Sequence, residues 1–290
     1  MTTAAFEFDT GKKFRRRPLA VRAVHTLVHS PTLPLAWFVV LVAVAAAIAP
    51  HVFTSSDPLG SNPGDAFLPP SWTHLFGTDQ LGRDMFARIV YGARNTLQAT
   101  VYAVLIAFVG GGVIGLVSGY IGRGVDAVVM RVIDVLLSVP SLLLCMTIVV
   151  ALGYGTMNVA LAVGIAAIAS FARVMRAEVI RVVGSQYTEA TRGLGARWPR
   201  ILFLHVLPNS ISSLASLAAL EFGTAVLAIA GLGFLGYGAP PPTPEWGLEV
   251  SEGRNFLATY PWLAIIPGAV IAVVVIATNR ISTSLKDSNR

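Results

Sequence analysis

The segment SQYTEATRGLGARWPRILFLHVLPN, residues 185–209, is a polar and positively charged island between two long hydrophobic runs. Its pattern predicts a short helix over residues 186–194 that ends at Gly195, because glycine commonly terminates helices. A second helix is expected over residues 196–204, ending at Leu207-Pro208, because proline does not continue a helix. A hydrophobic chain that keeps a helix-turn-helix of this kind out of the bilayer presents it to another protein.

The composition around this island is that of a membrane protein. Hydrophobic residues make up 54% of the 290 residues, charged residues only 12%, and the mean hydropathy is +0.69. These values exclude a soluble globular domain of ordinary charge content. The single cysteine, Cys145, lies in an apolar run, which excludes an intrachain disulfide framework and a thiolate metal site.

Runs of about 20 uncharged residues are long enough to cross a hydrocarbon core of about 30 Å as helices. A turn at residues 153–155, Gly-Tyr-Gly, divides one 38-residue run into two such segments. The sequence therefore predicts an all-α, polytopic membrane protein with six transmembrane helices. They are expected at residues 35–53, within 95–122, and at 135–152, 157–171, 210–235 and 261–279.

The distribution of basic residues predicts the orientation. If the N-terminus lies inside, 17 of the 21 lysines and arginines fall on the inner side and four on the outer side. Since inner loops carry the excess of positive charge, both termini and residues 185–209 are expected to face the cytoplasm of a cell membrane. Residues 1–34 then form a basic cytoplasmic tail. A cleaved signal peptide is the alternative, but Pro50 follows the small residues directly and disfavours cleavage.

Residues 54–94 are expected to form an extracytoplasmic loop followed by an interfacial helix. The loop, residues 54–76, lacks periodicity, and Gly77 suits a turn. Thr78 or Asp79 could cap a helix that begins near Leu81 and continues into the second membrane helix. The candidate residues of this stretch are Gly77, Thr78, Asp79, Gly82, Arg83 and Asp84.

Glu221 lies inside the fifth expected membrane helix. An ionisable group at membrane depth commonly marks a pathway or a paired contact, so Glu221 is a candidate for lining a solute path. The alternative places it one or two turns from the cytoplasm, where it reaches water or Arg200.

Asp134 is expected to lie at the interface and to pair with Arg131. Gly111 and Gly115 form G-x-x-x-G, which predicts a closely packed helix interface.

The island resembles the E-A-A-x3-G-x9-I-x-L-P loop of permease subunits of ATP-binding-cassette (ABC) importers. The residues that carry this resemblance are Glu189, Ala190, Thr191, Gly195, His205, Leu207, Pro208 and Asn209. Thr191 replaces the second alanine of the pattern, and His205 stands where the general pattern has isoleucine. The ending His205-x-Leu207-Pro208-Asn209 is similar to the branch that imports peptides, nickel and related solutes. The resemblance implies that this loop docks in a cleft of an ATPase subunit and couples it to the membrane helices.

Two further stretches support the resemblance. Residues 77–94 resemble the G-T-D-x-x-G-R-D motif of the C-type permease in peptide importers, and residues 233–247 resemble the F-L-G-x-G…P-x-P-x-W-G segment. The charges of the first motif either form an interfacial salt-bridge network or contact a binding protein. The resemblance implies a permease core at residues 95–283, with a short cytoplasmic tail at 284–290. The expected partners are a B-type permease, ABC ATPase subunits, an extracytoplasmic solute-binding protein and the lipid bilayer.

The chain itself lacks the signatures of an enzyme. It contains no G-x4-G-K-[ST] phosphate loop, so ATP and Mg²⁺ are expected only in the partner ATPase subunits. His205 has no second ligand at metal spacing, so we expect neither a metal site nor a cofactor in this chain. We also expect no catalytic residue and no nucleic-acid partner. The function implied is ATP-driven import of di- or oligopeptides, with nickel, glutathione or another small solute as the alternative. A self-sufficient secondary transporter is a further alternative, although the halves show no clear repeat.

Overall fold

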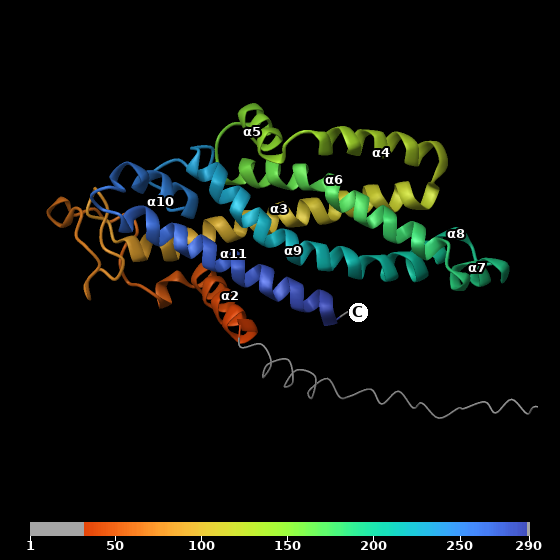
Figure 1. Ribbon diagram of the computed structural model, residues 1–290, viewed down its shortest axis with the longest axis horizontal. Coiled ribbons are helices and arrows are strands. Elements are labelled where there is room, and N and C mark those ends of the chain that lie inside the picture. The colour runs from red at the N-terminus through yellow and green to blue at the C-terminus, as the bar shows by residue number, and fades with distance from the viewer. Residues whose placement is uncertain (1–31, 289–290) are drawn as a thin grey trace, which may run out of the picture.

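The computed structural model describes residues 32–288, and within that range it is built from helices and loops, without a β-strand. Figure 1 shows the helices lying roughly along one long axis. Two short helices, α7 (Gln186–Gly193) and α8 (Trp198–Ile201), lie at one end. The short helix α10 (Trp246–Gly253) and the loop before α3 lie at the opposite end. Most of the predicted basic tail, residues 1–31, falls outside the described residues.

Long apolar helices build the body of the fold, as the sequence predicts. Four are long and apolar enough to cross a membrane, counting α8 to α9 as one continuous helix. A fifth span is formed only if the bent pair α4–α5 is counted, and α2 is a shorter apolar helix of 17 residues. The count of six spans therefore stays a prediction. The bounds are α2 Thr32–Ile48, α3 Met85–Ile121, α4 Arg123–Ser138, α5 Ser141–Leu152, α6 Thr156–Val183, α9 Leu207–Phe234 and α11 Trp262–Ser288.

Two glycines of α3 bring it into direct contact with α6. A Cβ atom at Gly111 would lie 2.8 Å from the carbonyl oxygen of Ile168, and one at Gly115 would lie 2.7 Å from the Cβ of Met175. These separations are shorter than van der Waals contact, so only glycine permits this approach. In a bilayer, such small residues let helices pack backbone to backbone. The predicted G-x-x-x-G interface is confirmed, and it lies within the chain.

The third expected span is broken in the middle, which corrects the prediction of one helix over residues 135–152. α4 and α5 meet at Val139-Pro140 and are bent by 95° (Figure 1). The cause is Pro140: the residue before a proline is pushed out of the α region, and Val139 is extended with φ −86° and ψ 131°. The turn at Gly153 and Gly155 is confirmed, and both glycines have positive φ.

The helix after the first loop begins later than predicted. Asp84, rather than Thr78 or Asp79, caps α3, because its Oδ1 accepts the backbone N–H of Ala87 at 2.8 Å. The first turns of α3 pack inside the protein, since Ala87 and Arg88 are fully buried. α3 therefore runs without a break from this buried start to Ile121.

Candidate functional site

The 185–209 segment begins with the predicted short helix, α7. The Ser185 side chain caps α7 by accepting the N–H of Thr188. The helix ends in a Schellman motif, in which Gly195 donates to the carbonyl of Arg192 at 3.0 Å and Ala196 donates to that of Thr191 at 3.4 Å. Gly195 has φ +82°, which a side chain would strain. The tight turn at this end of the molecule therefore depends on Gly195.

The surface of this segment is apolar and basic. Leu194, directly at the turn, is 90% exposed, and Glu189 and Ala190 are exposed beside it. Sequence reasoning did not single out Leu194 or the other large exposed side chains around it. Their exposure depends on the turn at Gly195 and on which helix faces point outward, and the sequence pattern alone shows neither. The exposed apolar side chains are Tyr187, Leu194, Trp198, Phe203 and Leu204, and the exposed basic ones are Arg192, Arg197 and Arg200.

The second half of the segment corrects the prediction that Leu207-Pro208 ends a helix. The chain is helical from Trp198 to Phe234 without interruption, and Pro208 lies in the first turn of α9. A π-helical stretch over Leu202–Val206 makes this possible: the N–H of Leu207 bonds back to the carbonyl of Leu202. Pro208, which has no N–H to donate, follows this wider turn directly. The segment is thus directly continuous with a long apolar helix.

His205 and Asn209, the polar residues near the end of the segment, make local contacts. The ring of His205 packs edge-on against that of Tyr187, with the centroids 5.1 Å apart. The Asn209 side chain donates to the carbonyl of His205 at 2.6 Å. Both residues therefore contribute to the link between α7 and the start of α9.

The inner side of the 185–209 segment is attached to the long helices. Thr188 is fully buried and donates to the carbonyl of Val182 at the end of α6, at 2.8 Å. Tyr120, near the end of α3, donates to the carbonyl of Trp198 at 3.2 Å. Ile201 and Val206 pack in one hydrophobic cluster with residues of α3, α6 and α9. The segment is therefore packed against three long helices.

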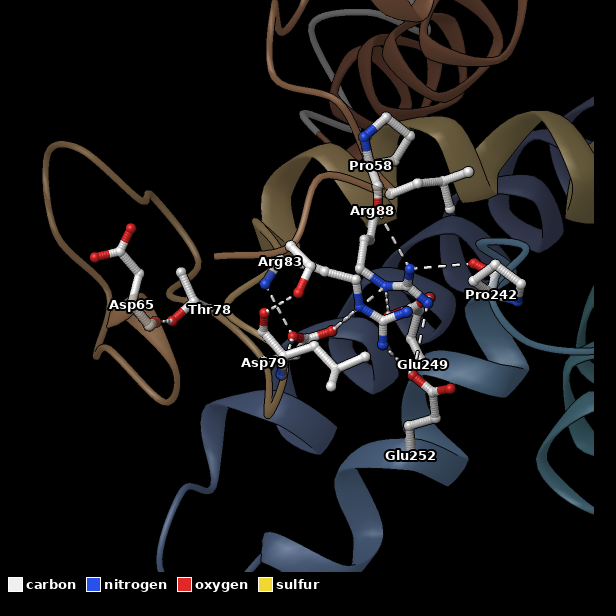
Figure 2. A network of polar contacts seen from close by, with 12 residues as sticks. Pro58, Asp65, Thr78, Asp79, Arg83, Arg88, Pro242, Glu249 and Glu252 are labelled. Carbon is white, nitrogen blue, oxygen red and sulfur yellow. Dashed lines mark hydrogen bonds and ion pairs between the residues drawn. The ribbon is translucent and has the colours of Figure 1, made fainter. Parts of the chain in front are cut away.

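At the opposite end, a buried ion pair joins α3 to α10. Figure 2 shows Arg88 at the centre of a polar network. Its Nη2 lies 2.7 Å from the Glu249 Oε1, and its Nε donates to Oε2 at 2.9 Å. The guanidinium also donates through Nη1 to the carbonyls of Pro58 and Pro242. Burial raises the pKa of Glu249, and Arg88 offsets part of that rise.

The predicted residues Asp79 and Arg83 belong to the same network. The Arg83 Nε donates to the Asp79 Oδ2 at 2.5 Å, and Nη2 donates to Glu252 at 3.0 Å. Both side chains are almost completely buried, with Arg83 3% and Asp79 6% exposed (Figure 2). These charges therefore bind each other within the chain. Sequence reasoning did not find Glu249 and Glu252, because nothing in their local pattern points to residues 161 and 169 positions away.

The other residues of the 77–84 motif hold the loop in place. Thr78 is fully buried, and its hydroxyl accepts the N–H of Leu68 at 2.8 Å and donates to the carbonyl of Asp65. Asp84 contacts His74 Nδ1 at 2.8 Å in addition to capping α3. Gly77 and Gly82 both have positive φ, and a Cβ at Gly82 would collide with the carbonyl oxygen of Asn62.

A second buried carboxyl lies beside this network. Glu245 precedes α10, is fully buried, and packs its carboxylate against Gly233 and Gly238. Burial raises the pKa of Glu245 to about 7. The N–H groups of Gly247 and Ala239 lie close enough to offset part of the rise, although neither makes a well-formed hydrogen bond. Glu245 is therefore largely protonated in mildly acidic conditions.

Glu221 lies midway along α9, inside its helix as the sequence predicts, and not one or two turns from the helix end as in the alternative. It is 14 residues after Leu207 and 13 before Phe234, or about 20 Å from each end at 1.5 Å per residue. Glu221 is half-buried and lines a cavity of about 490 Å³. The contact with Arg200 that belonged to this alternative is not formed among the described residues. Asp134 also differs from the prediction, since it pairs with Arg173 of α6 at 2.6 Å rather than with Arg131.

Comparison with known proteins gives one family. Residues 111–288 match the family described as "Binding-protein-dependent transport system inner membrane component". The dipeptide transport system permease protein DppC of Alkalihalophilus pseudofirmus is 42% identical over 242 residues, which cover 83% of this chain and 80% of that protein. The DppC protein of Haemophilus influenzae is 37% identical over 257 residues, covering 87% of each chain. The glutathione transport system permease protein GsiD of Pectobacterium atrosepticum is 39% identical over 219 residues, which cover 76% of this chain and 73% of that protein.

Solved structures share the fold. A crystal structure of an amino acid ABC transporter with histidines aligns with a TM-score of 0.55 at 20% identity, covering 69% of this chain and 94% of that one. An inward-facing structure of the MetNI methionine ABC transporter aligns with a TM-score of 0.53 at 18% identity, and the alignment covers 68% of this chain and 96% of that one. At this level of identity, the likeness concerns the arrangement of helices.

Proposed function

Since the chain belongs to the family of binding-protein-dependent transport system inner membrane components, we propose that it is the C-type permease subunit of an ATP-driven importer of di- and oligopeptides. Relatives that carry the dipeptide permease name align over most of this chain. Their names support peptides as the solute. Glutathione is the second candidate, because a relative named as a glutathione permease is 39% identical.

One observation carries the mechanism: the 185–209 segment exposes an apolar and basic tip while its inner side is attached to α3, α6 and α9. Leu194, 90% exposed at the Gly195 turn, is one of several exposed apolar side chains of this segment, with Tyr187 and Trp198, and such a surface suits a pocket on another protein. The continuous helix from Trp198 to Phe234 extends from this tip along the body of the fold. A push on Leu194 is therefore transmitted along α9.

We assign the remaining tasks to partner subunits. ATPase subunits hold ATP and Mg²⁺ and bind the 185–209 segment, with Glu189, Ala190, Gly195, Leu207 and Pro208 in the coupling role. ATP binding closes the ATPase pair, moves the segment and changes the arrangement of the membrane helices. A B-type permease completes the solute path, and an extracytoplasmic binding protein delivers the solute at the α10 end. In this arrangement both termini and the 185–209 segment face the cytoplasm.

The test is reconstitution of the chain with the permease, ATPase and binding protein encoded beside it. Uptake of a labelled dipeptide into proteoliposomes should require ATP on the side of the 185–209 segment and binding protein on the other side. Uptake by this chain alone, driven by an ion gradient without an ATPase, would instead support a secondary transporter. Uptake of glutathione in preference to dipeptides would support the second solute.

A further inference from the structure

The structure places an acidic residue in a cavity at a broken helix. The cavity of about 490 Å³ lies between α3, the α4–α5 break, α6 and α9, and Glu221 is its only ionisable carboxyl among the described lining residues. This volume falls in the range of about 300–1,000 Å³ typical of small-molecule sites. The cavity exists because small side chains form much of its wall: alanines from three helices, among them Ala103, Ala166 and Ala225, line it.

The lining combines one negative charge with several hydrogen-bonding groups. Beside Glu221, the polar side chains of the cavity are hydroxyls, contributed by Ser138, Ser141, Ser170 and Thr224. The bend at Val139-Pro140 lines the same cavity. A helix end leaves backbone groups without intrahelical partners, and non-helical backbone at membrane depth is tolerated where it lines a cavity. The break therefore places non-helical backbone in the wall of this cavity.

Glu221 has no counter-ion within the chain's described part. Among the described side chains, those of residues 32–284, no arginine, lysine or histidine forms an ion pair with it, whereas Asp126 and Asp134 on the neighbouring α4 both pair with arginines of α6. A carboxylate midway along an apolar helix is costly unless a positive group reaches it. The space in front of Glu221 is open, so a ligand can supply that group.

We propose that Glu221 binds the terminal ammonium group of the transported peptide during its passage, with cavity hydroxyls accepting the remaining N–H bonds. An ammonium has three donors and no acceptor, which matches a carboxylate in a cavity whose other polar side chains include four hydroxyls. A nickel ion is a poorer match, because it favours imidazole and several convergent ligands. The inference rests on the proposed function and adds to it the solute group that the membrane path recognises.

Paired solutes test this inference in the reconstituted complex. Transport of a dipeptide is compared with that of the same dipeptide lacking the α-amino group, each corrected for its affinity for the isolated binding protein. Glu221→Gln should lower dipeptide transport about tenfold, the effect of losing a hydrogen bond to a charged group, and leave transport of the des-amino analogue unchanged. Glu178→Gln is the matched control: Glu178 lies outside this cavity and pairs with Arg181, so both solutes should be transported as by the parent.

Equal effects of Glu221→Gln on the two solutes would overturn the inference while the proposed function stands. Absence of ATP-dependent uptake of any peptide by the parent complex would overturn both.

A second measurement does not depend on the binding protein or on turnover. In a Cys145→Ala, Ala228→Cys background, a dipeptide should slow thiol labelling at position 228, which also lines the cavity, and the N-acetylated dipeptide should not. Loss of this protection on adding Glu221→Gln supports the inference, and protection that persists in Glu221→Gln contradicts it.

Discussion

Arg88 in the first turn of α3 and Glu249 in α10 form a buried ion pair that joins two parts of the chain separated by 161 positions. Both side chains are almost fully withdrawn from solvent, at 0% and 2% exposure. The pair fixes α10 over the start of α3 and holds two loop carbonyls, of Pro58 and Pro242, at the same point. This end of the molecule is therefore a rigid, cross-linked unit.

Replacing Arg88 by methionine should destabilise the protein by about 3–5 kcal/mol, because it leaves a buried carboxylate without its partner. The added replacement of Glu249 by leucine should recover much of that loss. Unfolding of the purified protein in detergent measures both changes. Arg94→Met is the matched control: Arg94 lies on the same helix but is exposed, so its loss should change the free energy of unfolding little. A double variant as unstable as Arg88→Met would contradict this account.

Glu245 should make stability depend on pH. Its pKa is raised from 4.5 to about 7, so between these values the folded state keeps a proton that the unfolded state releases. The free energy of unfolding should therefore fall as the pH rises through this window, by about 2–3 kcal/mol between pH 5 and 8. Glu245→Gln should remove this component. The measurement is the difference between parent and variant at each pH, and a difference that stays constant with pH would refute the assignment.

Gly111 and Gly110 should respond differently to the same change. A Cβ at Gly111 meets backbone atoms of α6, including the Ile168 carbonyl at 2.8 Å, whereas one at Gly110 meets only the flexible end of the Ile168 side chain at 3.0 Å. Gly111→Ala should cost about 1–3 kcal/mol through forced separation of the helices. Gly110→Ala should cost much less. Equal effects on thermal unfolding would show that α3 and α6 are not in backbone contact.

Gly195 and Gly193 form a second matched pair. A Cβ has open space at both positions, but only Gly195 has a positive φ. Gly195→Ala should strain the turn by about 1–2 kcal/mol and reduce solute-stimulated ATP hydrolysis by the complex, without affecting membrane insertion. Gly193→Ala should leave ATP hydrolysis unchanged. If both variants hydrolyse ATP like the parent, the geometry of the turn does not matter for coupling.

Local chemistry made several features predictable from the sequence. Glycine at positions 153, 155 and 195 determines turns through positive φ, and the G-x-x-x-G pattern identified the α3 interface. Proline was harder to interpret. Pro140 breaks a helix where the apolar run suggested continuity, while Pro208 leaves its helix intact because the preceding π-helical stretch accommodates it. The outcome depends on neighbouring backbone geometry, which periodicity does not encode.

Long-range pairing could not be predicted in this way. The partners of Asp79 and Arg83, and the pairing of Asp134 with Arg173, depend on which helices become neighbours. The importance of Leu194 was missed for a related reason: exposure of an apolar residue becomes visible only when the turn around it is known. Glu221 was identified by its charge in an apolar run, but the cavity in front of it required the fold.

The most direct test of the central claim, that the 185–209 segment is the binding site of the ATPase, is site-specific cross-linking in the assembled complex. In a Cys145→Ala background, Leu194→Cys carries a photoactivated cross-linker, and Trp72→Cys serves as the control at the opposite end, where Trp72 is 97% exposed. Position 194 is predicted to cross-link to the ATPase subunit and position 72 is predicted not to. An ATPase adduct at position 72, or none at position 194 in a complex that retains its ATPase, would contradict the account.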